Sequence, residues 1–265
     1  MLRRMAEVLL GSVKVRRTIP KCVGEGVVVA NAKVGGLRYL FRSARRLDPV
    51  LFDVVQATVR PDDVVWDIGG NVGLYAAAAA GLAGRAGRIY SVEADRDAFS
   101  LLLQTAKAQP AGHAPINCLN VAVAKDCGVV NFNIAKRSRS SNFIVGFGST
   151  QSGGVIESRL IPSLNLDVLL SAFSKPDVIK IDVEGAELVV LQGAQLILST
   201  VRPTISIEVC SELAIAVAEL LREHRYRLFD GSTLQELGPS EMAPWDTVGI
   251  PFESELSTRF SAYAV

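Results

Sequence analysis

Short apolar runs alternate with helix-like segments along most of this chain. Five runs rich in β-branched residues and bounded by turn residues are predicted to be strands, at residues 64–68, 88–93, 116–123, 177–183 and 204–209. Helices are predicted between most of them, at residues 73–82, 97–108, 186–198 and 212–224. Continuous apolar strands are typical of a sheet that is covered on both faces, so the pattern predicts an α/β fold with a doubly wound, mostly parallel sheet.

Two regions depart from this alternation. Between the third and fourth sheet strands, a second β-rich run and a Ser/Gly-rich stretch at residues 138–154 predict a hairpin and loop insertion at about residues 125–165. Residues 1–47 are predicted to be an N-terminal addition with a short amphipathic helix and two short strands, and nothing in it looks catalytic. The main domain is then residues 48–265. It starts with a helix that has Asp48 as its N-cap and Pro49 at its first position.

Charge and length exclude several classes of protein. The 265 residues carry a formal charge of +1, so a nucleic-acid partner is not expected. The longest apolar runs fall short of the ~20 residues that a membrane-spanning helix needs, and the N-terminus lacks the pattern of a signal peptide, so we expect a cytoplasmic protein without a membrane span. The four cysteines are far apart and are expected to be reduced and mostly buried. An assembly of identical subunits stays open.

The strongest motif runs from Val64 to Gly73, where a strand ends in Asp67 and a glycine turn leads into a helix rich in alanine. Glycines let the backbone approach a ligand, and small alanines let the helix pack closely on the sheet. Twenty residues after Gly73, the next strand ends at Glu93, whose carboxylate can accept both hydroxyls of a ribose. The motif therefore predicts a nucleoside-containing cofactor.

Asp67 indicates which cofactor this is. A dinucleotide site needs a complete Gly-x-Gly-x-x-Gly turn that receives a pyrophosphate, whereas this turn carries a carboxylate that would repel phosphate. S-adenosylmethionine has an ammonium and a sulfonium and no phosphate, so it suits an acid at this position. A phosphate-binding loop is excluded because no Gly-Lys-Ser/Thr follows the turn.

Six stretches of the chain also match a known pattern, namely residues 65–75 (VWDIGGNVGLY), 92–95 (VEAD), 120–124 (NVAVA), 166–170 (LDVLL), 178–187 (VIKIDVEGAE) and 202–209 (RPTISIEV). Residues 48 to 250 thereby resemble the FkbM family of S-adenosylmethionine-dependent methyltransferases. The resemblance implies a class I methyltransferase fold of about seven strands, with a last strand near Thr247–Pro251 that pairs antiparallel. It implies O-methylation of sugars, polyketides or other secondary and cell-envelope metabolites. Gly70 and Ala94 depart mildly from the family, where many relatives carry Ala and Pro.

The cofactor site expected from motif and resemblance together has nine residues: Asp67, Gly69, Gly70, Asn71, Gly73, Glu93, Asp95, Asn120 and Ala122.

The acceptor side is expected at the ends of two central strands. Asp182 lies at the carboxyl end of the strand at residues 177–183, and Glu208 lies near the end of the neighbouring one, at the edge where open α/β sheets bind ligands. Both are catalytic candidates, since two carboxylates can orient a hydroxyl and one can act as a general base. Lys180, unusual in a central strand, is expected to pair with Glu208 or Asp67, so Glu208 is equally well interpreted as a structural partner. Glu187 is either a site residue or a helix cap.

The sequence therefore predicts a methyltransferase with S-adenosylmethionine as cofactor, no metal, and a small-molecule or glycan acceptor. Neither histidine lies at a strand end, so Ser-His-Asp and zinc mechanisms are unsupported. Two alternatives remain. One is an NAD(P)-dependent Rossmann-type oxidoreductase, and the other is a non-catalytic binding module on the methyltransferase fold.

Overall fold

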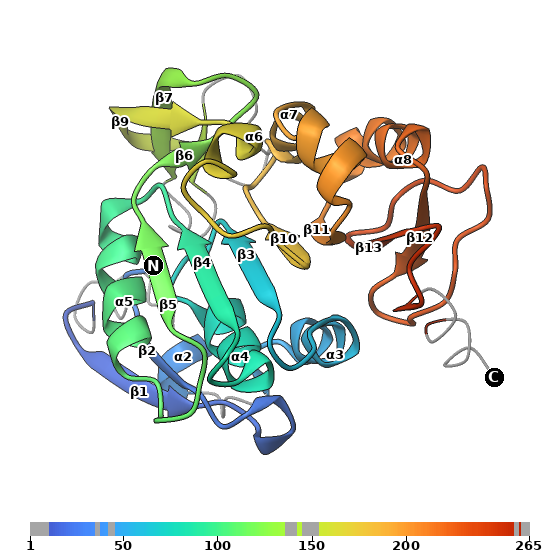
Figure 1. Cartoon of the computed structure of the whole chain (residues 1–265). Coiled ribbons are helices and arrows are strands. Elements are labelled where there is room, and N and C mark those ends of the chain that lie inside the picture. The colour runs from blue at the N-terminus through green and yellow to red at the C-terminus, as the bar shows by residue number, and fades with distance from the viewer. Residues whose placement is uncertain are drawn as a thin grey trace.

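The computed structural model describes residues 11–34, 38–41, 46–135, 142–144, 154–256 and 260. The expected N-terminal helix and most of the Ser/Gly-rich stretch lie outside these residues. The main sheet has seven strands in the order β12-β13-β11-β10-β3-β4-β5 (Figure 1). Their bounds are β3 Val64–Ile68, β4 Arg88–Val92, β5 Ile116–Leu119, β10 Val178–Ile181, β11 Thr204–Glu208, β12 Tyr226–Asp230 and β13 Asp246–Pro251.

The strand order confirms the predicted fold class. Neighbouring strands from β5 to β11 pair parallel, while β13 pairs antiparallel with both β11 and β12. The expected antiparallel strand near Thr247–Pro251 is therefore present. This is the class I methyltransferase arrangement, and it places the carboxyl ends of β3, β4, β10 and β11 at one edge of the sheet.

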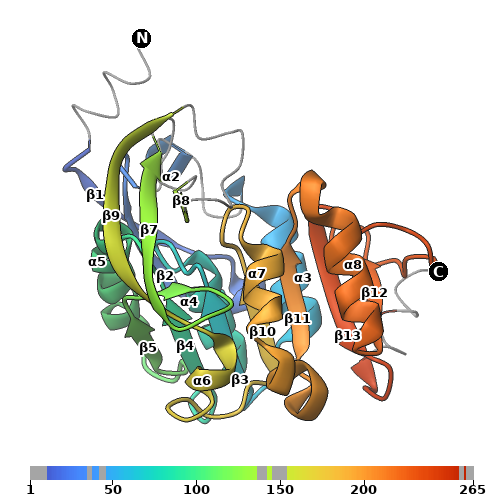
Figure 2. The ribbon, with the colours of Figure 1, turned by 90° about the horizontal axis from the view of Figure 1, so that it is seen from above.

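Helices cover both faces of this sheet (Figure 2). On one face lie α3 (Pro49–Thr58), α4 (Leu74–Ala83) and α5 (Arg96–Lys107), and on the other α6 (Leu166–Leu169), α7 (Glu187–Gln192) and α8 (Ala214–Glu223). Both faces of the sheet are apolar, because side chains alternate along β3. Val65 belongs to the core under α4, and Trp66 belongs to the core under α7 and α8. The Ala76–Ala80 run of α4 is completely buried.

The N-terminal segment packs into the same core as α4 and α5. It contains β1 (Lys14–Thr18), η1 (Lys21–Val23), β2 (Val27–Asn31) and α2 (Arg38–Phe41), with β1 and β2 paired antiparallel. Its approach to α4 requires glycine, since a Cβ on Gly81 would lie 2.7 Å from the Val23 carbonyl oxygen. The Val29 backbone N–H donates to Thr105 Oγ1 of α5 at 2.9 Å. The segment therefore closes one side of the main core.

A second sheet is inserted between β5 and β10. It contains β6 (Ala122–Val123), β7 (Gly128–Ala135), β8 (Phe143–Ile144) and β9 (Val155–Leu164), in the order β6-β9-β7-β8. This sheet lies beyond the ends of β4 and β5 (Figure 1). Asn142 connects it to the main sheet, because its side chain accepts from the Ala135 N–H at 2.8 Å and donates to Asp95 at 2.7 Å.

Three expectations differ from the structure. The run 116–123 is split between the two sheets, because Asn120 turns away to donate to the Glu93 carbonyl oxygen at 2.7 Å. The helix expected at 186–198 ends at Gly193, where a Cβ would lie 2.6 Å from the Ala124 carbonyl oxygen, and helical turns resume as η5 (Ile197–Val201). The expectation of mostly buried thiols was wrong: Cys22 and Cys127 are exposed, whereas Cys118 and Cys210 are half-buried. Within the described ranges, every helix is too short or too polar to cross a membrane.

Candidate active site

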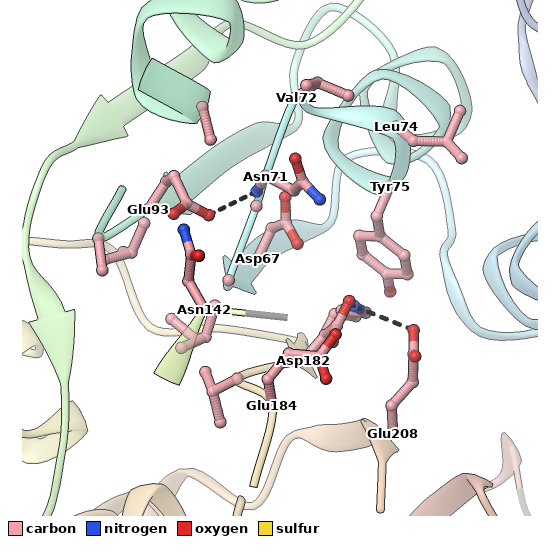
Figure 3. A pocket seen from close by; sticks show the side chains of 18 of the residues that line it. Asp67, Asn71, Val72, Leu74, Tyr75, Glu93, Asn142, Asp182, Glu184 and Glu208 are labelled. Atoms are coloured by element: carbon pink, nitrogen blue, oxygen red, sulfur yellow. Dashed lines mark hydrogen bonds and ion pairs between the residues drawn. The ribbon is translucent and has the colours of Figure 1, made fainter. Parts of the chain in front are cut away.

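A cavity of about 230 Å³ opens at the carboxyl edge of the main sheet. The main sheet, its loops and the first turns of α4 and α5 contribute Asp67, Ile68, Gly69, Gly70, Asn71, Val72, Leu74, Tyr75, Val92, Glu93, Ala94, Ala98, Lys180, Asp182, Val183, Glu184 and Glu208. The inserted sheet and the residues before it add Val121, Ala122, Val123, Phe132, Asn142 and Ile144. The segment before α3 and α3 itself add Arg38, Tyr39, Asp48 and Leu51. Polar side chains from several elements thus face one space (Figure 3).

The glycine turn after β3 is pressed against the ends of its two neighbouring strands. The N–H groups of Gly69 and Gly70 both donate to the Val92 carbonyl oxygen, at 2.9 and 3.0 Å. Gly69 has φ +84°, and a Cβ there would collide with the Asp182 carbonyl oxygen. Only glycine fits this position, so the turn brings the ends of β4 and β10 to one place.

Asp67, in β3, carries the clearest sign of a ligand. Its side chain is 1% exposed, and Oδ2 accepts from Ser91 Oγ at 2.8 Å. Among the described residues, Asp67 Oδ1 and the nearby Asn71 Oδ1 are buried without a hydrogen-bond partner. Burial raises the pKa of Asp67 to about 6, while Lys180 and Ser91 partly offset this. A buried acceptor at a cavity is costly unless a ligand donates to it, so Asp67 fits an ammonium or another N–H donor.

Glu93 holds two backbone amides at the end of β4. Its Oε2 accepts from the Asn71 N–H at 2.7 Å, and Oε1 accepts from the Asp95 N–H at 2.6 Å. Burial raises the pKa of Glu93 to about 7, although both hydrogen bonds favour the carboxylate. The side chain also lines the cavity beside Asn142 (Figure 3). Its remaining lone pairs can still accept from a ligand.

Six of the nine expected cofactor residues line the cavity: Asp67, Gly69, Gly70, Asn71, Glu93 and Ala122. The other three support the loops around it. Gly73 has φ +89° and faces Leu102 and Thr105. Asp95 accepts from the Asp97 N–H at 2.9 Å and from Asn142, and Asn120 donates to the backbone after β4.

Lys180 joins the two acceptor-side carboxylates. Its Nζ lies 2.7 Å from Asp182 Oδ2 and 3.4 Å from Glu208 Oε1. Burial alone would lower the pKa of Lys180, but the carboxylates of Asp182, Glu208 and Asp67 raise it overall. The expected Lys180–Glu208 pair is therefore confirmed. The closer pair with Asp182 was missed, although strand alternation already placed both side chains on one face.

Three glutamates near Lys180 differ in their surroundings, namely Glu208, Glu184 and Glu187. Burial and the Asp182 carboxylate raise the pKa of Glu208 to about 7, against the effect of Lys180. Burial, followed by the carboxylates of Asp182 and Glu208, raises the pKa of Glu184 to about 8. Glu187 Oε1 accepts from the Gly185 N–H at 2.7 Å, and Glu187 is not among the residues that line the cavity. The structure thus favours a role at the start of α7, in the first turn, over a site role for Glu187.

Sequence reasoning missed the contribution of the N-terminal segment. Arg38 and Tyr39 of α2 line the cavity, although they are 142 and 141 positions before Lys180 in the chain. Asp48 both caps α3, accepting from the Leu51 N–H at 3.1 Å, and lines the cavity. No local pattern marks these residues as site residues. Among the described residues, no three His, Cys, Asp or Glu side chains come together as a metal site.

This chain is similar to a known protein family and to a curated protein. The family model described as Methyltransferase FkbM domain matches residues 67–228. A curated relative, the hexuronic acid methyltransferase AglP of Haloferax volcanii, is 29% identical over 134 residues. This match covers 50% of this chain and 50% of that protein, so the chain spans about half the length of the relative.

Two solved structures are also similar to this chain. The methyltransferase FkbM from Methylobacillus flagellatus is 17% identical with a TM-score of 0.45, covering 72% of this chain and 48% of that one. Aeropyrum pernix fibrillarin, solved with natively bound S-adenosyl-L-methionine, is 12% identical with a TM-score of 0.42. That match covers 72% of this chain and 67% of fibrillarin.

Proposed function

This chain belongs to the methyltransferase FkbM family, and from that premise we propose that it transfers a methyl group from S-adenosylmethionine to a hydroxyl oxygen of a sugar. The cofactor, when bound, supplies a methyl group already activated by the sulfonium. The observation that carries the proposal is the buried carboxylate of Asp67, which lines the cavity and whose Oδ1 has no donor among the described residues.

The residues at the carboxyl ends of β3 and β4 fit this cofactor. Asp67 would accept from the ammonium of its amino-acid part, and Glu93 would accept from the ribose hydroxyls. Gly69, Gly70, Asn71 and Ala122 would form the surface against which it lies. Gly73, Asp95 and Asn120 would act indirectly, by fixing the loops that present these groups.

Asp182 and Glu208 are proposed to face the acceptor. Lys180 pairs with one oxygen of each carboxylate, so the other oxygen of each can accept a hydrogen bond from a hydroxyl group. The lining residues include six acidic and two basic side chains, so they offer many hydrogen-bond acceptors for the hydroxyl groups of a sugar. The name of the Haloferax volcanii relative, a hexuronic acid methyltransferase, supports a sugar acceptor, free or within a glycan. The wider class of proposed acceptors includes polyketides and other secondary metabolites with a free hydroxyl group.

Catalysis by these residues would rest chiefly on position. Little acid–base help is needed when the methyl group is already activated, so holding the acceptor oxygen in line and excluding water would supply most of the rate gain. Asp182→Asn and Glu208→Gln should therefore lower turnover more than they lower cofactor affinity.

The test has a binding stage and a turnover stage. We expect S-adenosylhomocysteine, but not NADH, to raise the melting temperature, because Asp67 would face the phosphates of a dinucleotide. The protein is then incubated with S-adenosylmethionine and a panel of hexuronic acids and methyl glycosides, and S-adenosylhomocysteine release is measured. Asp126→Asn, an exposed substitution outside the cavity, is the control for Asp182→Asn. Stabilisation by NADH alone would favour the oxidoreductase, and cofactor binding without turnover on any acceptor would favour the binding module.

A further inference from the structure

Glu184 holds an unusual position at the acceptor end of the cavity. It follows β10 by three residues, is half-buried, and lines the cavity below Asp182 in Figure 3. Its φ is +52°, in the left-handed region that non-glycine residues rarely adopt, and Gly185 follows at +95°. Uncommon backbone conformations of this kind cluster at functional sites. The turn therefore presents the Glu184 side chain to the cavity in a fixed place.

Within the described ranges, its carboxylate differs from the others nearby in having no hydrogen-bond or ion-pair partner. Asp182 and Glu208 both pair with Lys180. Glu93 accepts from two backbone amides, Asp67 from Ser91, and Glu187 from Gly185. None of the described residues forms a hydrogen bond or ion pair with the Glu184 carboxylate. Glu184 can therefore take up a proton without first breaking such a contact.

We propose that Glu184 is the general base of the methyl transfer, a role that rests on the proposed function. The acceptor O–H bond breaks and its proton moves to a carboxylate oxygen of Glu184. The oxygen forms its bond to the methyl carbon, and the S–C bond breaks with its electron pair left on sulfur. The products are a methyl ether, neutral S-adenosylhomocysteine and protonated Glu184. Asp182 and Glu208 would orient the hydroxyl without taking its proton.

The surroundings of Glu184 suit this task. Burial raises its pKa to about 8, and the neighbouring carboxylates of Asp182, Glu208 and Glu187 act in the same direction. The positive charge of Lys180 acts in the opposite direction and lowers the pKa of Glu184. A base with a pKa near the working pH is both available and strong enough to accept a proton.

Sinefungin allows a test that needs no acceptor. In this cofactor analogue, a carbon that carries a primary amine replaces the methylsulfonium, so its ammonium lies where the methyl group would be transferred. We expect Glu184→Gln to weaken sinefungin by ~10-fold or more, the size of a lost charged hydrogen bond, and to leave S-adenosylhomocysteine within about twofold. Retained S-adenosylhomocysteine affinity also shows that the variant is folded. Glu219→Gln on the exposed face of α8 is the matched control.

The outcomes separate the two hypotheses. If neither compound binds the wild-type protein, the proposed function fails. If both bind, and Glu184→Gln changes neither or weakens both equally, the role of Glu184 is overturned while the methyltransferase stands. A selective loss of sinefungin in Asp182→Asn, with none in Glu184→Gln, would assign the base to Asp182. For wild type, the preference for sinefungin should increase as pH rises towards about 8, whereas in Glu184→Gln it should stay flat.

Discussion

Glu93 Oε2 accepts a hydrogen bond from the Asn71 backbone N–H at 2.7 Å, which joins the end of β4 to the glycine turn after β3. The other oxygen accepts from the Asp95 N–H at 2.6 Å, at the start of α5. Glu93 therefore has two tasks, because the group proposed to bind the ribose also fixes the loops on either side of it. Its substitution should affect stability as well as affinity.

Glu93→Ala should lower the free energy of unfolding by about 1–3 kcal/mol, because it leaves buried backbone N–H groups without their acceptor. It should also weaken S-adenosylmethionine by ~1.5–3 kcal/mol through lost hydrogen bonds. Chemical denaturation of the free protein measures the first effect, and calorimetry measures the second. Glu93→Gln keeps one acceptor oxygen and should lose less of both. Unchanged stability in Glu93→Ala would contradict the structural role.

Asp67→Asn tests the attraction between the turn and the cofactor ammonium. The variant keeps an oxygen for Ser91, so it should fold, but S-adenosylhomocysteine affinity should fall by ~10–100-fold. The pKa of Asp67 is raised to about 6, and an ammonium binds only the ionised carboxylate. Wild-type affinity should therefore increase from pH 5 to pH 7 and then level off. Calorimetry across this range should give a shallower profile for Asp67→Asn, and a matching slope in both proteins would exclude Asp67 as the ammonium partner.

Gly70 lies where the structure has no room for a side chain. A Cβ at this position would collide with Ser91 Oγ and lie 2.9 Å from Asp67 Oδ2. Gly70→Ala should therefore cost about 1–3 kcal/mol in overpacking, measured by urea denaturation. In the double variant Gly70→Ala, Ser91→Ala the obstructing hydroxyl is gone, so the overpacking cost should be largely recovered. Simple additivity of the two single substitutions would contradict this coupling.

Glu184 should make the stability of the free protein depend on pH. Its pKa is 4.5 in the reference state and about 8 in the folded protein, so between these values the folded state keeps a proton that the unfolded state has lost. The free energy of unfolding contributed by this group therefore falls as pH rises from 4.5 to 8. Glu184→Gln should be more stable than wild type at pH 8, and the difference should shrink towards pH 4.5. Urea midpoints across this range measure it, with Glu219→Gln as the control. A constant difference at all pH values would contradict the shift.

The parts of the site that sequence could predict are those built from local patterns. Asp67 to Gly73 form one strand, turn and helix, and the position of Asp182 after a buried strand places it at the ligand edge of any such sheet. The hydrogen-bond partners of each side chain could not be predicted in the same way. Whether Glu93 would accept from backbone amides, or Asp95 from Asn142, depends on loops that meet only in the folded chain.

Long-range contacts account for the rest. Arg38 and Tyr39 reach the cavity because the N-terminal segment packs against α4 and α5, and the sequence around them carries no sign of a ligand. Glu184 precedes α7, and its positive φ turns the backbone before that helix begins at Glu187. The contribution of Arg38 and Tyr39 follows from packing between elements distant in the chain. Periodicity and spacing encode neither this packing nor the φ of Glu184.

The complete burial of Ala76–Ala80 in α4 also affects how the cofactor would associate. The helix lies between the main sheet and the N-terminal segment, with Gly24 and Gly81 in backbone contact, so it has no room to shift or rotate. The glycine turn at its start is therefore ordered before any ligand arrives, and its conformational entropy is lost during folding. A preorganised site of this kind loses little further entropy on binding. Cofactor association should then be a single diffusional encounter, with an observed rate that increases linearly with cofactor concentration and does not level off.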